Sequence, residues 1–153
     1  MQEDHVLQGI ELSCDLIKRF EGFCSAPYLC PAGVPTIGYG CTFYEDGTRV
    51  TLHDRAITRE RATAMLHHVV VKQFLPTVSN LCPGLDTPQR LAAVLSWTYN
   101  LGPANLRAST MRKRINTQQW AEAAQECLRW VRAGGKVLKG LQARRRIESQ
   151  LLL

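Results

Sequence analysis

The sequence predicts an α+β fold in which a small sheet comes early and helices follow. Three observations support this prediction. A helical period runs over residues 13–23, strand and turn signals occur over residues 34–52, and only helical patterns come after them. Segregated elements of this kind are typical of α+β architecture. At 153 residues the chain is long enough to bury a core, and we expect residues 1–153 to form a single domain.

The first predicted helix ends near a glycine. Ser13 is a candidate N-cap and Gly22 a candidate terminator. The apolar positions at helical spacing are Leu16, Ile17, Phe20 and Phe23. Glu21 then lies in the last turn, where the helix dipole disfavours a negative charge.

The next segment is predicted to be a loop followed by a hairpin. Residues 24–35 contain prolines, a glycine and no apolar period, so we expect a loop there. Asp46-Gly47 is typical of a tight turn, and it separates two strand-like stretches at residues 42–44 and 49–52.

The remaining chain is predicted to be helical. Thr58 is a candidate cap for a long helix that ends before Pro76, and Thr87-Pro88 is a cap and first-turn proline for a helix over residues 89–100. Gly102 is a predicted helix stop, and Thr110 and Thr117 are predicted helix starts. Gly134-Gly135 is a predicted break before a basic helix over residues 140–152. We expect the sheet lobe and the helical lobe to leave a cleft between them.

Charge is distributed unevenly along the chain. Residues 1–106 carry eight Lys/Arg and ten Asp/Glu, whereas residues 107–153 carry eleven Lys/Arg and three Asp/Glu. The basic third favours an anionic partner, which by charge alone is a cell-wall polymer, a membrane surface or nucleic acid. No recognised nucleic-acid motif accompanies the basic residues, and no apolar run is long enough to span a membrane.

Six cysteines occur in a chain whose start does not read as a secretory signal, at Cys14, Cys24, Cys30, Cys41, Cys82 and Cys127. We expect the protein to be made in a cytoplasm with reduced thiols. A disulfide between Cys30 and a nearby cysteine is one hypothesis for redox control, and simple packing of the thiols is the alternative. Cys24, Cys30 and Cys41 lack the paired short spacings of zinc ligands, so no metal or other cofactor is expected.

Glu21, Cys30 and Thr36 are the strongest candidates for catalysis. Cys30 follows Glu21 by nine residues, and Thr36 follows Cys30 by six and opens a glycine-rich turn. Hydrolysis of a glycosidic bond needs one proton-donating carboxylic acid and, on the other face of the sugar, groups that activate or hold a water molecule. An acid, a thiol and a hydroxyl in one short segment match that requirement.

This spacing resembles the catalytic signature of the phage-type lysozymes (endolysins) of glycoside hydrolase family 24. Two further segments, WTYNLG at residues 97–102 and RWVRAGGKVLKGL at residues 129–141, are similar to the middle and C-terminal portions of lambdoid-phage lysozymes. The resemblance implies a lysozyme-like fold. It also implies a muramidase that cleaves the β-1,4 bond between N-acetylmuramic acid and N-acetylglucosamine in peptidoglycan and lyses the cell wall.

The resemblance also implies roles for individual residues. Glu21 matches the general acid, Cys30 a position that is Asp or Cys in the family, and Thr36 the threonine that helps to hold the attacking water. The residues at positions that line the substrate cleft are Tyr28, Gly40, Tyr99, Asn100, Arg129 and Trp130. An arginine of the last helix pairs with the acid in the family, and Arg144, Arg145 and Arg146 are equal candidates. Many members of the family have a histidine at the position of Cys41.

The resemblance further implies a monomer that is made in the host cytoplasm and acts on the wall in the periplasm after a holin-type membrane lesion. The main alternative function is a binding module, either a wall-binding relative without activity or a nucleic-acid binder that uses Arg144–Arg146. A Cys–His hydrolase that uses Cys30 and His53 would need a base that nothing in the sequence positions. A virion-borne role during entry is an alternative to lysis.

Overall fold

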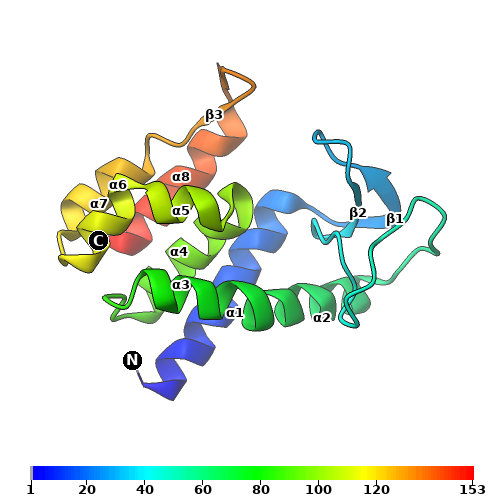
Figure 1. The fold of residues 1–153 in the computed structure, drawn as a ribbon, viewed down its shortest axis with the longest axis horizontal. Helices are drawn as coiled ribbons and strands as arrows, with labels where there is room; N and C mark the ends of the chain where they lie inside the picture. Colours follow the sequence, from blue (N-terminus) through cyan, green and yellow to red (C-terminus); the bar gives the residue numbers. More distant parts are fainter. Residues whose placement is uncertain (1) are drawn as a thin grey trace.

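The computed structural model describes residues 2–153 and confirms an α+β architecture (Figure 1). Two antiparallel strand pairs, β1–β2 and β3–β4, accompany a set of helices. The helices on either side of the first strand pair are α1 (Glu3–Glu21) and α2 (Arg59–Val69). Among these described residues, no helix combines the length and the apolar character needed to cross a bilayer.

Helix α1 is longer than predicted. It begins at Glu3, and Ser13 lies inside it, where its buried hydroxyl donates to the Ile10 carbonyl oxygen at 2.7 Å instead of capping the helix. Glu3 and Asp4 suit the first turn because acidic side chains there interact favourably with the helix dipole. The predicted end is confirmed, since Gly22 adopts a φ of 71°, which a glycine tolerates without strain.

The segment expected to be a loop contains strand β1 (Cys24–Leu29), which pairs antiparallel with β2 (Pro35–Gly38). The register shifts between Cys24 and Tyr28, where Pro27 has no N–H to give to the ladder. The predicted Asp46-Gly47 turn is confirmed: Gly47 has a φ of 86°, and a single bridge joins Phe43 to Arg49. A small core of Ile37, Cys41, Val50 and Met65 lies under this sheet lobe.

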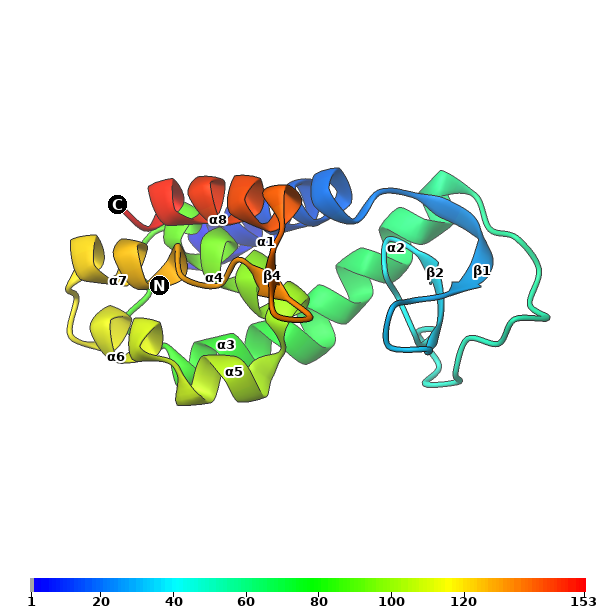
Figure 2. The ribbon, with the colours of Figure 1, turned by 90° about the horizontal axis from the view of Figure 1, so that it is seen from above.

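One helical rod joins the two lobes, and it does not end before Pro76 as predicted. Thr58 caps α2 through a hydrogen bond from the Arg61 amide. The rod then widens into the π-helical segment η1 (Val70–Phe74) and continues as α3 (Leu75–Leu81) (Figure 2). A proline removes one helical hydrogen bond, and the wide turn immediately before Pro76 accommodates that loss.

The helical lobe contains α1 and the five helices after the rod, which are α4 (Pro88–Leu101), α5 (Pro103–Ala108), α6 (Thr110–Asn116), α7 (Trp120–Cys127) and α8 (Lys139–Leu152). The Thr87 cap and the last helix are confirmed. Helix α5 was not predicted. The predicted helix start at Thr110 is confirmed, and Ser109 caps this helix, α6. The predicted start at Thr117 is wrong because Thr117 ends α6.

The main core forms around α4, which packs between α1 and α8 (Figure 2). Trp97 is buried there, with its ring edge-on to Trp130 at 5.1 Å between centroids. The predicted break at Gly134-Gly135 is the turn of a short hairpin formed by β3 (Arg132–Ala133) and β4 (Lys136–Val137). Because α1 packs against α4 and Arg144 of α8 pairs with Glu21, the C-terminal residue of α1 is held next to the helical lobe.

Candidate active site

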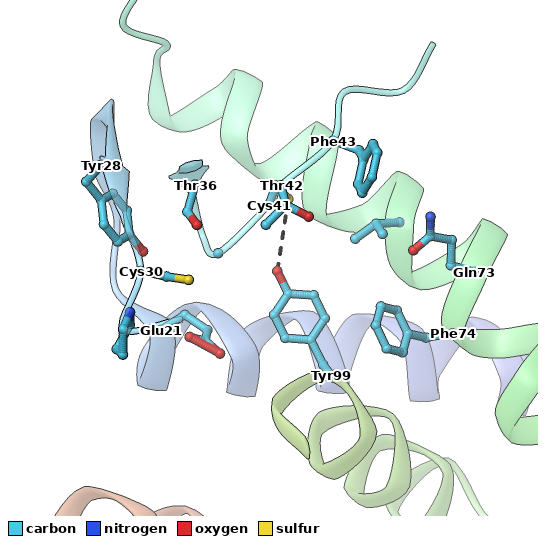
Figure 3. A pocket seen from close by; sticks show the side chains of 13 residues that line it. Glu21, Tyr28, Cys30, Thr36, Cys41, Thr42, Phe43, Gln73, Phe74 and Tyr99 are labelled. Atoms are coloured by element: carbon cyan, nitrogen blue, oxygen red, sulfur yellow. Dashed lines mark hydrogen bonds between the residues drawn. The ribbon is translucent and has the colours of Figure 1, made fainter. Parts of the chain in front are cut away.

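A cavity of about 340 Å³ opens between the sheet lobe and the helical lobe (Figure 3). Side chains from α1, β1, β2, the rod and α4 contribute to its wall. Its lining residues are Glu21, Tyr28, Cys30, Pro31, Thr36, Gly40, Cys41, Thr42, Phe43, Val69, Gln73, Phe74 and Tyr99. The three predicted catalytic residues therefore lie in one cavity, together with Tyr28, Gly40 and Tyr99.

Glu21 enters the cavity from the C-terminal end of α1. Its Oε1 lies 3.3 Å from Nη1 of Arg144, which donates from α8 across the lobe. The structure thus distinguishes the three candidate arginines: Arg144 pairs with Glu21, Arg145 pairs with Glu148 and Arg146 is exposed. Half-burial leaves the carboxyl group of Glu21 accessible from the cavity.

Cys30 lies at the start of the turn that joins β1 to β2. The turn is closed by hydrogen bonds from the Cys30 amide to the Val34 carbonyl oxygen at 3.0 Å and from the Gly33 amide to the Cys30 carbonyl oxygen at 2.8 Å. The backbone of Val34 lowers the pKa of the Cys30 thiol, and the backbone of Ala32 adds to the effect. A lowered pKa increases the thiolate fraction at neutral pH, and the thiolate is the basic and nucleophilic form.

Thr36 is buried on β2 directly opposite Tyr28 of β1. Its hydroxyl donates its proton to the Val34 carbonyl oxygen at 2.8 Å. The hydroxyl oxygen keeps lone pairs that accept hydrogen bonds. Figure 3 shows this oxygen and the Cys30 sulfur on the same side of the cavity, facing Glu21. The arrangement provides an acceptor and a base across the cavity from an acid.

Gly40 and Tyr99 form the floor next to Glu21. The Tyr99 hydroxyl donates to the Tyr39 carbonyl oxygen at 2.7 Å and lies 4.0 Å from the Cys41 sulfur. Burial raises the pKa of Cys41 to about 11 and the pKa of Tyr99 well above its ordinary value. Both groups are therefore neutral at neutral pH, which agrees with a structural role for Cys41.

Three predicted substrate-binding residues do not line this cavity. Asn100 accepts a hydrogen bond from Arg145, and Trp130 packs against Trp97. Arg129 is exposed, and its Nη1 lies 3.7 Å from Oε2 of Glu126. All six cysteines are free thiols in the structure.

The cavity is also lined by four residues that no sequence pattern predicted, which are Phe43, Val69, Gln73 and Phe74. Three of them belong to the helical rod: Val69 is the last residue of α2, and Gln73 and Phe74 lie in the π-helical segment η1. That segment is marked by the bond from the Leu75 amide to the Val70 carbonyl oxygen, five residues back. Pro76 in a helical pattern was the available sequence signal, because it favours an irregular turn before it.

The chain that forms this cavity matches a known protein family. Residues 18–148 match the family model described as phage lysozyme. The endolysin of Bacillus phage B103 is 33% identical over 139 residues, which are 91% of this chain and 51% of that protein. The SAR-endolysin of Enterobacteria phage P21 is 33% identical over 137 residues, which are 87% of this chain and 77% of that protein. The chain thus spans about half the length of one relative and about three quarters of the other.

Solved structures agree with these matches. The endolysin from Escherichia coli O157:H7 phage FAHEc1 superposes with a TM-score of 0.81 at 34% identity, covering 93% of this chain and 90% of that chain. The muramidase domain of SpmX from Asticaccaulis excentricus superposes with a TM-score of 0.78 at 30% identity, covering 92% of this chain and 94% of that chain. The lysozyme-like fold expected from the sequence is confirmed. The lysozyme-like structures and the curated relatives agree, and the chain therefore belongs to the phage lysozyme family.

Proposed function

We propose that this chain is a muramidase that hydrolyses the β-1,4 bond between N-acetylmuramic acid and N-acetylglucosamine in peptidoglycan and so lyses bacterial cell walls. One observation carries the proposal: Glu21, Cys30 and Thr36 line the same cavity between the lobes. Family membership supports it, because relatives are endolysins and a structural neighbour is a muramidase domain. We infer that residues 1–153 act as one catalytic domain.

Glu21 acts as the general acid. When the bond between the anomeric carbon and the glycosidic oxygen breaks, the proton of the Glu21 carboxyl goes to the departing oxygen. A water molecule on the opposite face of the sugar forms the new carbon–oxygen bond. The proton of that water goes to the Cys30 thiolate, while the Thr36 hydroxyl oxygen accepts a hydrogen bond from the water and orients it. This single displacement inverts the anomeric centre.

Arg144 stabilises the Glu21 carboxylate that remains after proton transfer, since its Nη1 already lies 3.3 Å from Oε1. Tyr28, Gly40 and Tyr99 contact the glycan from the cavity wall. Arg129 is exposed and contacts a longer strand outside the cavity. Asn100 and Trp130 are engaged with Arg145 and Trp97, so they support the cleft wall rather than contact the sugar.

The chain acts as a monomer without a cofactor, and its physiological partner is the peptidoglycan glycan strand rather than nucleic acid. It is made in the host cytoplasm, and a holin-type lesion gives it access to the wall in the periplasm. The cations of the last third that remain exposed, such as Arg129 and Arg146, favour adsorption to an anionic wall.

The proposal is tested by clearing of outer-membrane-permeabilised Gram-negative cells under reducing conditions. We expect the native protein to lower the turbidity of the suspension and to release soluble wall fragments. Binding to sedimented walls is measured in parallel. Binding without clearing would support an inactive wall-binding module instead, and salt-sensitive binding to DNA without clearing would support a nucleic-acid binder.

Gly40→Ala is expected to reduce hydrolysis by up to about 10²-fold, because small displacements of catalytic groups have effects of this size. Gly40 has a φ of 90°, and an added Cβ would lie 3.3 Å from the Tyr99 hydroxyl oxygen and 3.6 Å from the Glu21 carboxyl carbon. The methyl group thus presses on the Tyr99 hydroxyl and occupies the space next to the Glu21 carboxyl group. Left-handed backbone conformation also costs about 1–2 kcal/mol for a residue with a Cβ.

Gly47→Ala is the matched control. Gly47 has a φ of 86°, and no heavy atom lies within 4 Å of an added Cβ. Denaturant unfolding should show a similar loss of stability in both variants, whereas hydrolysis of purified peptidoglycan should fall in Gly40→Ala alone. An equal loss of activity in the two variants would mean that backbone strain, and not contact with Glu21, explains the effect.

A further inference from the structure

A cluster of buried charges lies behind Glu21 in the helical lobe. Arg144, Arg145 and Glu148 belong to α8, and their exposed fractions are 3%, 0% and 0%. Removing a charge from water is costly unless partners compensate for it. Helix α8 lies along α4, and both face the C-terminal end of α1 (Figure 2). The cluster is therefore positioned to act on the catalytic carboxyl group from behind.

The Arg144 guanidinium group lies between two carboxyl groups. Its Nη1 is 3.3 Å from Glu21 Oε1 and its Nε is 3.4 Å from Glu148 Oε2. Nη2 donates to the Ser96 carbonyl oxygen at 3.0 Å, and the Ser96 hydroxyl donates to Glu148 Oε2 at 2.6 Å. Arg145 Nη1 lies 3.1 Å from the other oxygen of Glu148. Arg144 is thus shared between the cavity and the core.

We propose that Glu148 is a positioning residue whose negative charge holds Arg144 and offsets the attraction of that cation for the Glu21 carboxylate. The inference rests on the proposed role of Glu21 as a general acid. A general acid must keep its proton until the glycosidic bond breaks, and a cation beside it favours loss of that proton. Glu148 binds the other side of the same guanidinium group, so the Arg144 charge is shared between two carboxyl groups.

The other titratable groups around Glu21 carry no compensating charge. Tyr28 from β1, Cys41 from the glycine-rich turn and Tyr99 from α4 face it, and burial raises the pKa of each. They are therefore neutral at neutral pH. Across the cavity the Cys30 thiolate adds negative charge when it forms. Within residues 2–153, Arg144 is the charged side chain bonded to Glu21.

Glu148 must itself be ionised to act in this way. Burial raises the pKa of Glu148, and Arg145 and Arg144 oppose that rise. The Ser96 hydroxyl also donates to the carboxylate. Two guanidinium cations and one hydroxyl donor lie next to the carboxylate and favour its ionised form.

The test is ¹³C NMR of the glutamate carboxyl groups against pH in the native protein and in Glu148→Gln. We expect the titration midpoint of Glu21 to move to lower pH in the variant, by up to about one unit, because loss of the Glu148 charge leaves the Arg144 cation to Glu21 alone. Above that midpoint the rate of peptidoglycan hydrolysis should fall by up to about tenfold, since an up to tenfold smaller fraction of Glu21 is protonated. A residue needed only for packing would change stability and leave the midpoint in place.

Ser96→Ala is the matched control, because it removes a hydroxyl from the same cluster and no charge. We expect the Glu21 midpoint to stay within the error of the measurement in that variant. If Glu148→Gln does not fold, Glu148→Gln combined with Arg145→Gln keeps the net charge of the cluster and should move the midpoint in the same direction.

The native protein provides a check that needs no variant. The Glu148 carboxyl signal should remain that of a carboxylate throughout the pH range of activity, and a protonated Glu148 in that range would overturn the inference. An unmoved Glu21 midpoint in an active enzyme would also overturn it and would leave the proposed function intact. Absence of hydrolysis by the native protein would instead contradict the proposed function.

Discussion

Glu21→Gln is expected to lower the rate of peptidoglycan hydrolysis by about 10²- to 10⁴-fold, the range that general acids contribute. Glutamine preserves the size of the side chain and its position at the end of α1, but it has no acidic proton for the leaving oxygen. Arg144 keeps its contacts with Glu148 and Ser96, so the fold should be retained. Release of reducing ends from purified peptidoglycan measures the effect.

Glu11→Gln is the control for this prediction, because Glu11 is an exposed residue of the same helix. Its rate should equal that of the native protein. Circular dichroism melting curves should show that both variants are folded. Residual activity of Glu21→Gln within a few fold of native would exclude Glu21 as the acid.

Cys30→Ala is expected to lower the rate by about 10²-fold, and Cys30→Asp to restore most of it. Alanine removes the group that accepts the water proton, whereas a carboxylate at the same place accepts it again. Cys24→Ala on the neighbouring strand is the control, because it removes another half-buried thiol. Full activity of Cys30→Ala would contradict a role for the thiol and leave Thr36 alone to place the water.

The pH dependence of Cys30 gives an independent measurement. The thiolate is the form that reacts with iodoacetamide, so alkylation increases as pH rises through the pKa of the thiol. Because the Val34 backbone lowers the pKa of Cys30, its alkylation should reach half its maximum rate at a lower pH than that of an ordinary thiol, about 8.5. Mass spectrometry of the peptide that contains Cys30 separates it from the other cysteines.

The candidate site was predictable from the sequence because most of it is local. Glu21, Tyr28, Cys30, Thr36 and Gly40 fall within 20 residues of chain, and the strand pair β1–β2 brings them to one wall. Within one short segment, the spacing of the residues and the glycines and prolines that mark its turns can be read directly from the sequence. Tyr99 came from the resemblance alone, since an aromatic residue on a helix is usually a core residue.

Other features depend on tertiary packing and had no local signal. The choice of Arg144 over its two neighbours depends on which side of α8 faces α1 and α4. Ser13 has the residue type of a cap, but the helix continues through it because the turns before it also bury apolar side chains such as Ile10. Pro27 argued against a strand, yet an irregular register in β1 accommodates it. The π-helical turn that lines the cavity differs from these features, because Pro76 directly after it is a local signal.

The most direct test of the account is the chemical identity of the new reducing end. Purified peptidoglycan is digested with the native protein, the fragments are reduced with borohydride, and the terminal sugar is identified by mass spectrometry. We expect reduced N-acetylmuramic acid at the ends of the fragments. Reduced N-acetylglucosamine, or fragments cut only in the peptide, would contradict the proposal that this cavity cleaves the bond on the muramic acid side.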